Sequence, residues 1–326
     1  MTDSSAPAGR PQIALNAHAK VNLALAVGAP IDDDSERDGM HPIATWMAPI
    51  DLADELLVTR LEDDRLSRYA ILWHPDAPQP AASIDWSVRD DLAVRAHLLL
   101  EREVGRSLPV QLKLDKRIPV GGGLGGGSSD AASMLVAVRD LFELDLSDGD
   151  LRELAIQLGS DVPFFLQDRE DRSSLGPGPA VIEGLGERCT PVRPVHPSSA
   201  HLVLVLPEFG CPTGGVYRAF DHLITDASGE TDHVFRDVEV HKLASTGEVR
   251  SSELFNDLAA PAQQMQPKLS AVIANIERAI GATAQVTGSG SSLFLPCPGG
   301  EVEAELLAQQ LDSHLVGCRA IATRLL

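Results

Sequence analysis

The feature that most constrains the fold is a glycine-rich run from Pro119 to Ser129, P-V-G-G-G-L-G-G-G-S-S. Nearly every residue from Gly121 to Gly127 is glycine. Glycine inside a helix or strand costs backbone entropy and contributes no side chain, so the run predicts a loop that turns sharply or approaches a ligand closely. The small, hydroxyl-rich residues that begin at Ser128 are typical of a helix start.

Such a loop indicates phosphate binding, because exposed N–H groups in a glycine loop and at a helix N-terminus attract anions. Two alternatives stay open. Gly121, Gly123 and Gly126 also satisfy the dinucleotide pattern G-x-G-x-x-G, which would suit a nicotinamide-dependent oxidoreductase. However, the preceding segment 111–120 is charged and contains proline, whereas the first strand of a dinucleotide fold is nearly continuous in apolar residues. The other alternative is a flexible loop without a ligand. No Gly-Lys-Ser/Thr completes a Walker loop.

Strand and helix patterns are mixed without regular β-α-β alternation, which favours an α+β fold. We expect strands near 12–28, 41–61, 109–118, 201–206, 284–296 and 319–325, and helices near 88–104, 128–141, 147–158, 213–220, 267–280 and 301–314. The stretch 168–200 has the least pattern and suggests a soft domain boundary. The expected divisions are a disordered tail at 1–11, an N-terminal domain at 12–170 and a C-terminal domain at 171–326.

Composition limits the classes of function. The formal net charge is −20, which argues against general nucleic-acid binding because that requires a basic surface. No apolar run approaches the roughly 18 residues of a membrane span, and the polar start lacks the apolar core of a secretion signal. The cysteines form no C-x-x-C pair, so a reduced, cytoplasmic protein is the simplest expectation.

Two charged residues are candidates for chemistry. Asp161 lies in Gly-Ser-Asp-Val-Pro-Phe-Phe at 159–165, where Pro163 favours an extended residue before it. A carboxylate at that junction either accepts a hydroxyl proton during phosphoryl transfer or caps a helix. Lys20 lies inside an apolar strand and needs an anionic partner only if it points inward. Asn22 shares the face of Lys20, because side chains alternate along a strand.

A second glycine-rich segment, Thr287-Gly288-Ser289-Gly290-Ser291-Ser292, lies far downstream. Alone it indicates no more than a hairpin turn. Together with the first loop it indicates a supporting contact to phosphate or substrate.

Separated motifs together resemble the signatures of the GHMP kinases. They are His18-Ala-Lys-Val-Asn-Leu23, Pro119 to Ala132, and Thr287 to Ser291. Within that family, the two Gly-Gly-Gly triplets around Leu124 followed by Ser-Ser-Asp-Ala-Ala, and the segment 159–165, most resemble the kinases of 4-diphosphocytidyl-2-C-methyl-D-erythritol in the non-mevalonate isoprenoid pathway. The resemblance extends from about Ile13 to Leu326.

The resemblance implies a ribosomal-S5-like N-terminal domain and a ferredoxin-like C-terminal domain. It implies transfer of the γ-phosphoryl group of ATP, which carries Mg²⁺, to the 2-hydroxyl of the cytidylyl substrate. A GHMP kinase for homoserine or a mevalonate derivative is the alternative. Asp161 would be the general base, assisted by Lys20. The protein would be a monomer or a homodimer, without nucleic-acid or membrane partners.

By the same resemblance, other residues would contact the ligands. His41 and Tyr217 would bind the cytosine, and Ser129 is a candidate magnesium ligand. The residues expected at the ATP phosphates are Pro119, Val120, Gly121, Gly122, Gly123, Leu124, Gly125, Gly126, Gly127, Ser128 and Ser129. The residues expected at the substrate are Asn22, His41, Tyr217, Thr287, Gly288, Ser289 and Gly290.

Some residues depart from the family pattern. Met40 replaces the tyrosine before His41, and His18 replaces a proline. Asp91 replaces an asparagine near the adenine, which exchanges an amide that donates and accepts for an anion that only accepts. These departures concern base recognition and leave the phosphoryl chemistry unchanged. Because the chain is acidic, Lys116 and Arg117 beside the loop are expected to supply local positive charge.

Overall fold

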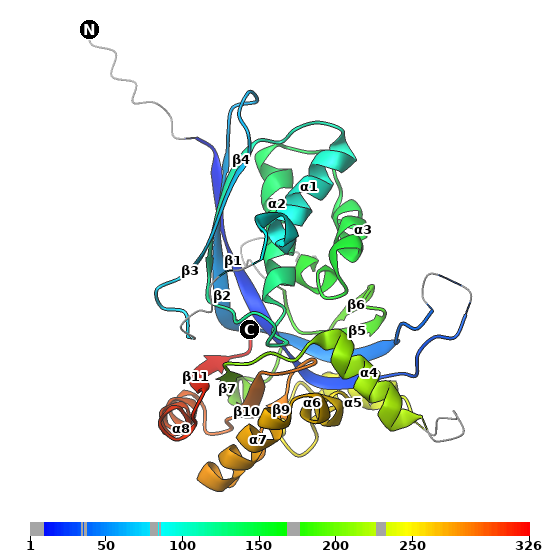
Figure 1. Ribbon diagram of the computed structural model, residues 1–326, viewed down its shortest axis with the longest axis vertical. Helices are drawn as coiled ribbons and strands as arrows, with labels where there is room; N and C mark the ends of the chain where they lie inside the picture. The colour runs from blue at the N-terminus through cyan, green and yellow to red at the C-terminus, as the bar shows by residue number, and fades with distance from the viewer. Residues whose placement is uncertain are drawn as a thin grey trace.

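The computed structural model describes residues 10–33, 35, 38–78, 84, 86–167, 177–225 and 233–326. Nearly all of the expected disordered tail at 1–11 lies outside these ranges. The described chain forms two β-sheets with helices packed on them (Figure 1). Within the described ranges, no helix is long and apolar enough to cross a lipid bilayer.

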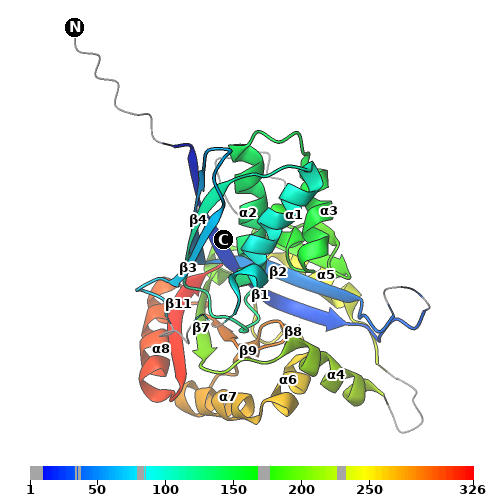
Figure 2. The ribbon, with the colours of Figure 1, turned by 45° about the horizontal axis from the view of Figure 1, so that its top comes forward.

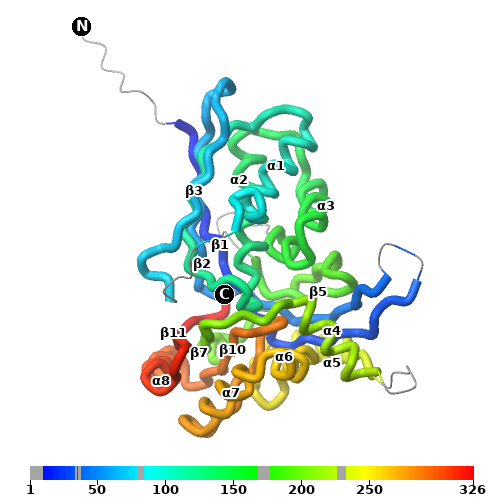
Figure 3. The backbone as a smooth tube through the Cα atoms, viewed as in Figure 1, coloured from blue at the N-terminus to red at the C-terminus, as the bar shows by residue number. Residues whose placement is uncertain are grey.

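The first sheet has seven strands in the order β3-β4-β2-β1-β8, with β5 paired to β2 and β6 paired to β5. Its longest pair is the antiparallel β1–β2, whose strands run side by side along the molecule (Figure 3). The strands are β1 (Gln12–Val27), β2 (Ile43–Arg60), β3 (Arg68–Trp73), β4 (Val110–Lys116), β5 (Ala180–Gly184), β6 (Arg188–Pro191) and β8 (Phe255–Asn256).

The burial of β1 changes along its length. Its first half alternates between exposed and partly buried residues, whereas every residue from Ala19 to Val27 is buried. This second half lies inside the molecule, because Val21 and Leu23 share a core cluster with Leu204 and Phe294 of the second sheet. Lys20 is therefore buried because it lies on this half of β1.

Three helices cover one face of the first sheet (Figures 1 and 2). They are α1 (Leu92–Val104), α2 (Gly126–Leu141) and α3 (Asp148–Leu158). The helix expected from residue 88 begins differently. A 3₁₀ turn, Val88–Asp90, comes first, and α1 starts after Asp91, which is extended and whose side chain caps the N–H of Ala93.

The second sheet has four strands in the order β11-β7-β10-β9, all antiparallel. Its strands are β7 (His201–Pro207), β9 (Gln285–Val286), β10 (Leu293–Pro296) and β11 (Cys318–Arg324). The helices of this half are α4 (Thr213–Ile224), α5 (Asp237–Thr246), α6 (Ala259–Met265), α7 (Pro267–Ile280) and α8 (Glu301–His314). This strand order confirms the ferredoxin-like expectation and the α+β class.

The sheets do not follow the expected division at residue 170. β5 and β6 come after it and pair with the first sheet, and so does β8, which pairs with β1. Helix α5 packs against β1 and β2. The domain boundary stays a prediction, and residues 168–176 lie outside the described chain.

We expect Leu135→Ala to lower the free energy of unfolding by about 2–5 kcal/mol, because it removes a buried side chain and leaves a cavity. Leu135 is fully buried in α2, within the cluster between the helices and the first sheet. Urea unfolding followed by circular dichroism measures the change. Leu98→Ala on exposed α1 surface is the control and should change stability by at most about 0.5 kcal/mol. Equal effects of the two variants would contradict this packing.

Candidate active site

An open cleft of about 560 Å³ lies at the glycine loop. Its lining includes the whole run from Pro119 to Ser128 and much of the predicted site. The predicted residues that join this run are Lys20, Asn22, Asp161, Tyr217, Gly288 and Ser289. Motifs separated by more than a hundred residues therefore meet at one surface, as the sequence predicts.

The glycine loop ends as the first turn of α2. Gly125 is the N-cap residue, in the left-handed conformation at φ 71°. The first helical hydrogen bond runs from the Ser129 N–H to the Gly125 carbonyl at 2.9 Å. The N–H groups of Gly126, Gly127 and Ser128 precede this bond and have no partner within the helix. Together with the helix dipole, they form a site for anionic groups.

The two glycine segments pack directly on each other. A Cβ atom on Gly123 would lie 2.5 Å from the Thr287 carbonyl oxygen, so no larger residue fits there without movement. The Ser292 N–H donates to the Gly122 carbonyl at 3.2 Å. Thr287 and Gly290 thus support the first loop, and Gly288 and Ser289 reach the cleft.

Lys20 and Asp161 form an ion pair in the cleft. The Lys20 Nζ lies 3.4 Å from Asp161 Oδ2 and donates to Asn22 Oδ1 at 2.7 Å. The side chain of Lys20 is 4 % exposed and that of Asp161 is 31 % exposed, so the ammonium is enclosed while the carboxylate remains accessible to a ligand. Lys20 therefore points inward, and Asp161 is its anionic partner.

The ion pair adjoins the glycine loop. The backbone N–H of Lys20 donates to the Leu124 carbonyl at 2.9 Å. A Cβ on Gly125 would lie only 3.0 Å from Lys20 Cγ. The pairing register of β1 with β2 shifts between His18 and Lys20, and such irregularities redirect side chains. Close contact with glycine thus places the ammonium beside the start of α2.

Asn22 is fixed by threonines that the sequence did not single out for this purpose. Its side-chain amide donates to Thr45 Oγ1 at 2.9 Å, and its backbone N–H donates to Thr287 Oγ1 at 2.9 Å. Asn256 holds the other side of the second glycine segment by donating to the carbonyls of Val286 and Gly288, each at 2.8 Å. The bonds of Asn22 to Thr45 and Thr287 orient its carbonyl oxygen toward Lys20.

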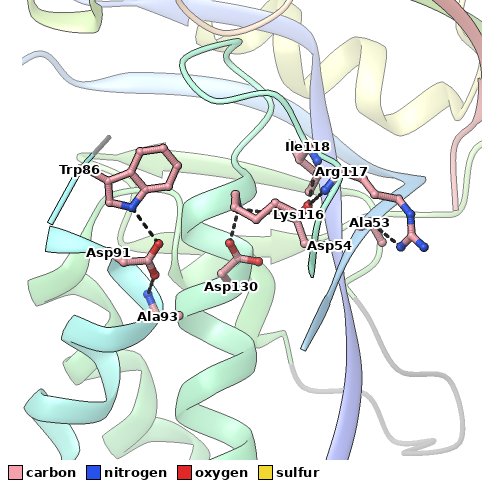
Figure 4. A network of polar contacts seen from close by, with 9 residues as sticks. All are labelled: Ala53, Asp54, Trp86, Asp91, Ala93, Lys116, Arg117, Ile118 and Asp130. Atoms are coloured by element: carbon pink, nitrogen blue, oxygen red, sulfur yellow. Dashed lines mark hydrogen bonds and ion pairs between the residues drawn. The ribbon is translucent and has the colours of Figure 1, made fainter. Parts of the chain in front are cut away.

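A buried ion cluster of Lys116 with two aspartates lies behind the loop (Figure 4). The Lys116 Nζ donates to Asp54 Oδ2 and to Asp130 Oδ2, each at 2.6 Å. The Asp54 carboxylate also accepts the backbone N–H groups of Arg117 and Ile118. Burial raises the pKa of Asp130 well above its usual value, and the Lys116 ammonium opposes that shift. Burial lowers the pKa of Lys116, but the two aspartates outweigh it and raise the pKa overall.

The expectation that Lys116 and Arg117 supply local positive charge beside the loop stays a prediction. Both cations are paired within the protein, Lys116 in the buried cluster and Arg117 with Glu55 at 2.8 Å. Lys20 is also paired with a carboxylate, but its partner Asp161 lines the cleft with it. Lys116 still lines the cleft wall.

The residues expected to bind cytosine lie together in an adjoining hollow of about 410 Å³. The rings of His41 and Tyr217 are 5.0 Å apart, and His41 Nε2 lies 2.6 Å from Asp221 Oδ1. Burial, with a smaller effect of the Asp161 charge, raises the pKa of Tyr217 to about 12, which keeps the phenol neutral. Met40 lies at the edge of this hollow and is 49 % exposed.

Comparison with known proteins agrees with this geometry. The family "GHMP kinases N terminal domain" matches residues 91–169. A 4-diphosphocytidyl-2-C-methyl-D-erythritol kinase of Caulobacter sp. is 36 % identical over 91 % of this chain and 92 % of its own length. One of Symbiobacterium thermophilum is 38 % identical over 64 % of each chain. The chain belongs to the 4-diphosphocytidyl-2-C-methyl-D-erythritol kinase family.

A solved structure supports the same assignment within the GHMP kinases. The crystal structure of 4-(cytidine 5'-diphospho)-2C-methyl-D-erythritol kinase is 32 % identical, with a TM-score of 0.69. The match covers 96 % of this chain and 99 % of that chain. The members of this family are kinases, and the GHMP kinases use ATP as the phosphate donor.

The sequence analysis did not predict several residues that line or support this cleft. Trp86 lines the cleft, Thr45 holds Asn22, and Asp221 holds His41. Asp54 and Asp130, the partners of Lys116, were also missed as site residues. A signal existed for Lys116, since lysine is scarce in the chain, but its partners come from distant segments and only the fold joins them.

Replacing Gly123 should cost more stability than replacing Gly121, although both residues have a positive φ of 75° and 72°. Alanine in this conformation costs about 1–2 kcal/mol at either position. Only Gly123→Ala also forces the Thr287 carbonyl to move, because nothing lies within 4 Å of a Cβ on Gly121. Urea unfolding of the two variants compares them, and equal losses of stability would contradict the contact between the glycine segments.

The raised pKa of Asp130 makes stability depend on pH. Between its usual pKa and its folded value, the folded chain holds a proton that the unfolded chain releases, so stability falls as pH rises through that window. Asp130→Asn removes this titration, and the difference in unfolding free energy between variant and wild type should grow in the variant's favour as pH rises. Urea unfolding at a series of pH values measures it. A difference that is independent of pH would contradict the raised pKa.

Proposed function

We propose that this protein transfers the γ-phosphoryl group of ATP to the 2-hydroxyl of 4-diphosphocytidyl-2-C-methyl-D-erythritol. The observation that carries the proposal is the Lys20–Asp161 pair, which lies in the cleft beside the glycine loop and the start of α2. Family membership supports the choice of substrate, since the relatives named above carry this activity in their names.

Asp161 acts as the general base in this proposal. Its accessible Oδ atom takes the proton of the substrate hydroxyl while the hydroxyl oxygen forms a bond to the γ-phosphorus. The bond from that phosphorus to the bridging oxygen breaks, and ADP leaves. Lys20 lies beside the Asp161 carboxylate and holds it in place. Its ammonium also stabilises negative charge on the transferred phosphoryl group.

The unpaired N–H groups at Gly126, Gly127 and Ser128 bind the phosphates of ATP. Mg²⁺ arriving with ATP would neutralise charge on the β- and γ-phosphates. Among the described residues there is no group of three or more His, Cys, Asp or Glu that could hold a metal. An ion that keeps several waters and is bound mainly by substrate phosphates needs no such group. Ser129 stays the candidate protein ligand, although it is 2 % exposed and comes directly after Ser128, the last residue of the run that lines the cleft.

The remaining parts of the proposal concern the substrate base and the setting. His41 and Tyr217 contact the cytosine, a role supported by their ring contact in the adjoining hollow. The four cysteines are free thiols, which supports a reduced, cytoplasmic location. The acidic chain acts on small molecules without nucleic acid, as a monomer or a homodimer.

Asp161→Asn tests the assignment of the base. We expect kcat to fall by about 10²- to 10⁴-fold, because an amide cannot accept the proton, while ATP affinity changes little. Coupled ADP release measures kcat, and calorimetry measures ATP binding. Asp140→Asn, at a half-exposed aspartate on α2 that pairs with Arg139, is the control and should retain wild-type turnover. An Asp161→Asn variant within tenfold of wild type would overturn the role.

A panel of acceptors tests the substrate. The purified protein is given ATP with the cytidylyl methylerythritol, homoserine or mevalonate, and ADP release is compared. We expect turnover with the cytidylyl compound alone, because only that acceptor has a base for His41 and Tyr217. Faster turnover with homoserine or mevalonate would replace this proposal with another GHMP kinase activity.

A further inference from the structure

Two aromatic side chains, Trp86 and Tyr217, line the cleft. Tyr217 lies at the end that holds Asp161 and the His41 hollow. Trp86 lies with Asp91 and Leu92, before and at the start of α1. The proposed reaction brings together two ligands that each carry a nucleobase, but the rings of His41 and Tyr217 serve only one of them.

Contacts of the glycines place these two ends on opposite sides of the phosphate loop. Gly125 contacts Lys20, since a Cβ there would lie 3.0 Å from Lys20 Cγ. Two residues later, a Cβ on Gly127 would lie 3.3 Å from Leu92 Cδ1. A nucleotide with its terminal phosphate at Lys20 and its other phosphates along this turn therefore has its base on the Leu92 side, near Trp86.

The indole of Trp86 is oriented by Asp91 (Figure 4). Its Nε1–H donates to Asp91 Oδ2 at 3.2 Å. Asp91 itself is fixed, because its Oδ1 accepts the Ala93 N–H at 3.0 Å and its residue is buried. Within the described ranges, no aromatic ring or guanidinium group packs on the Trp86 ring. The edge of the indole is thus held while its faces are not covered by another ring.

We propose that Trp86 is the stacking residue for the purine base of the phosphoryl donor, and that Asp91 is a positioning residue that orients its indole. The assignment of the donor rests on the proposed function. One oxygen of Asp91 accepts the indole N–H and the other accepts the Ala93 N–H. In this proposal the effect of Asp91 on the nucleotide passes through Trp86. This differs from the expectation that Asp91 meets the adenine edge directly.

The expected consequence is a change in donor affinity alone. Stacking of a base on an aromatic ring exists equally before and during phosphoryl transfer, so its loss raises KM without lowering kcat. Removing such a ring weakens binding by about 5- to 100-fold. The KM of the acceptor should stay unchanged, because Tyr217 and His41 lie at the other end of the cleft.

Three variants test the stack. Trp86→Ala should raise the KM and the dissociation constant for ATP by about 5- to 100-fold, with the acceptor KM and kcat within about twofold. Trp86→Phe keeps a ring and should stay within about threefold of wild type for ATP. ATP should also quench tryptophan fluorescence in wild type and in Trp73→Phe, a control outside the cleft lining, but not in Trp86→Phe. An unchanged ATP affinity in Trp86→Ala, or an equal rise of both KM values, would overturn the proposal.

A double-mutant cycle tests the role of Asp91. Asp91→Asn should still cap α1, since asparagine is a good N-cap residue. The indole N–H and the Ala93 N–H use different oxygens of Asp91, and in asparagine one of these positions is an NH₂ group that cannot accept the indole N–H. We expect a rise in ATP dissociation constant of about 3- to 10-fold that disappears in the Trp86→Ala background. Effects of the two substitutions that simply multiply would show that Asp91 contacts the nucleotide itself and would overturn its positioning role.

The binding measurements separate this inference from the proposed function. Calorimetry and fluorescence report on ATP in the absence of any acceptor. If ATP binds through Trp86 but no tested acceptor is phosphorylated, the stacking role stands and the proposed reaction fails. If the acceptor is phosphorylated normally by Trp86→Ala with unchanged ATP affinity, the reaction stands and the stacking role fails.

Discussion

The buried cluster of Asp54, Lys116 and Asp130 is the interaction on which the phosphate loop depends. It joins the middle of β2, the end of β4 and the second turn of α2, so it fixes both ends of the glycine run. Asp54 adds hydrogen bonds from the two backbone N–H groups that lead out of β4. A segment made of glycine has almost no side chains with which to hold itself. Its shape therefore has to be imposed from outside, by ions at its ends and by the second glycine segment along its length.

The cluster is costly, which makes its position informative. Taking three carboxylate or ammonium groups out of water carries a large desolvation penalty, and Asp130 Oδ1 has no hydrogen-bond partner among the described residues. Apolar residues of the same size would often be at least as stable. The ion pairs fix the relative orientation of the elements that carry them. The Lys116 ammonium donates a hydrogen bond to one aspartate on β2 and to another on α2. We interpret the cluster as a device that fixes where α2 begins relative to β4.

The sequence predicted the parts of the site that are local and missed those that the fold assembles. The loop at 119–129 was recognisable because no helix or strand tolerates so much glycine, and the inward direction of Lys20 followed only from family resemblance. The partners of Lys116 come from segments 62 and 14 residues away, and no periodicity marks them. Strand β3 and helix α5 were also missed, since short elements are fixed by pairing and packing more than by their own propensity. Trp86 comes before a helix whose start the sequence analysis placed at residue 88, whereas α1 begins at Leu92. The position of Trp86 at the cleft was therefore not predicted.

The double-sided burial of β1 has a consequence for how the molecule can move. The half of the strand that carries Lys20 and Asn22 is also the apolar partition between the helical layer and the second sheet. A motion that moved the two halves apart would expose this apolar surface to water. Such exposure costs a free energy of about 25 cal/mol for each Å² of apolar surface. The scaffold is thus expected to behave as a fixed frame in which ligands enter and leave past surface segments. Its reactive groups are then poised before either ligand arrives, and turnover needs no large-scale closing of one half upon the other.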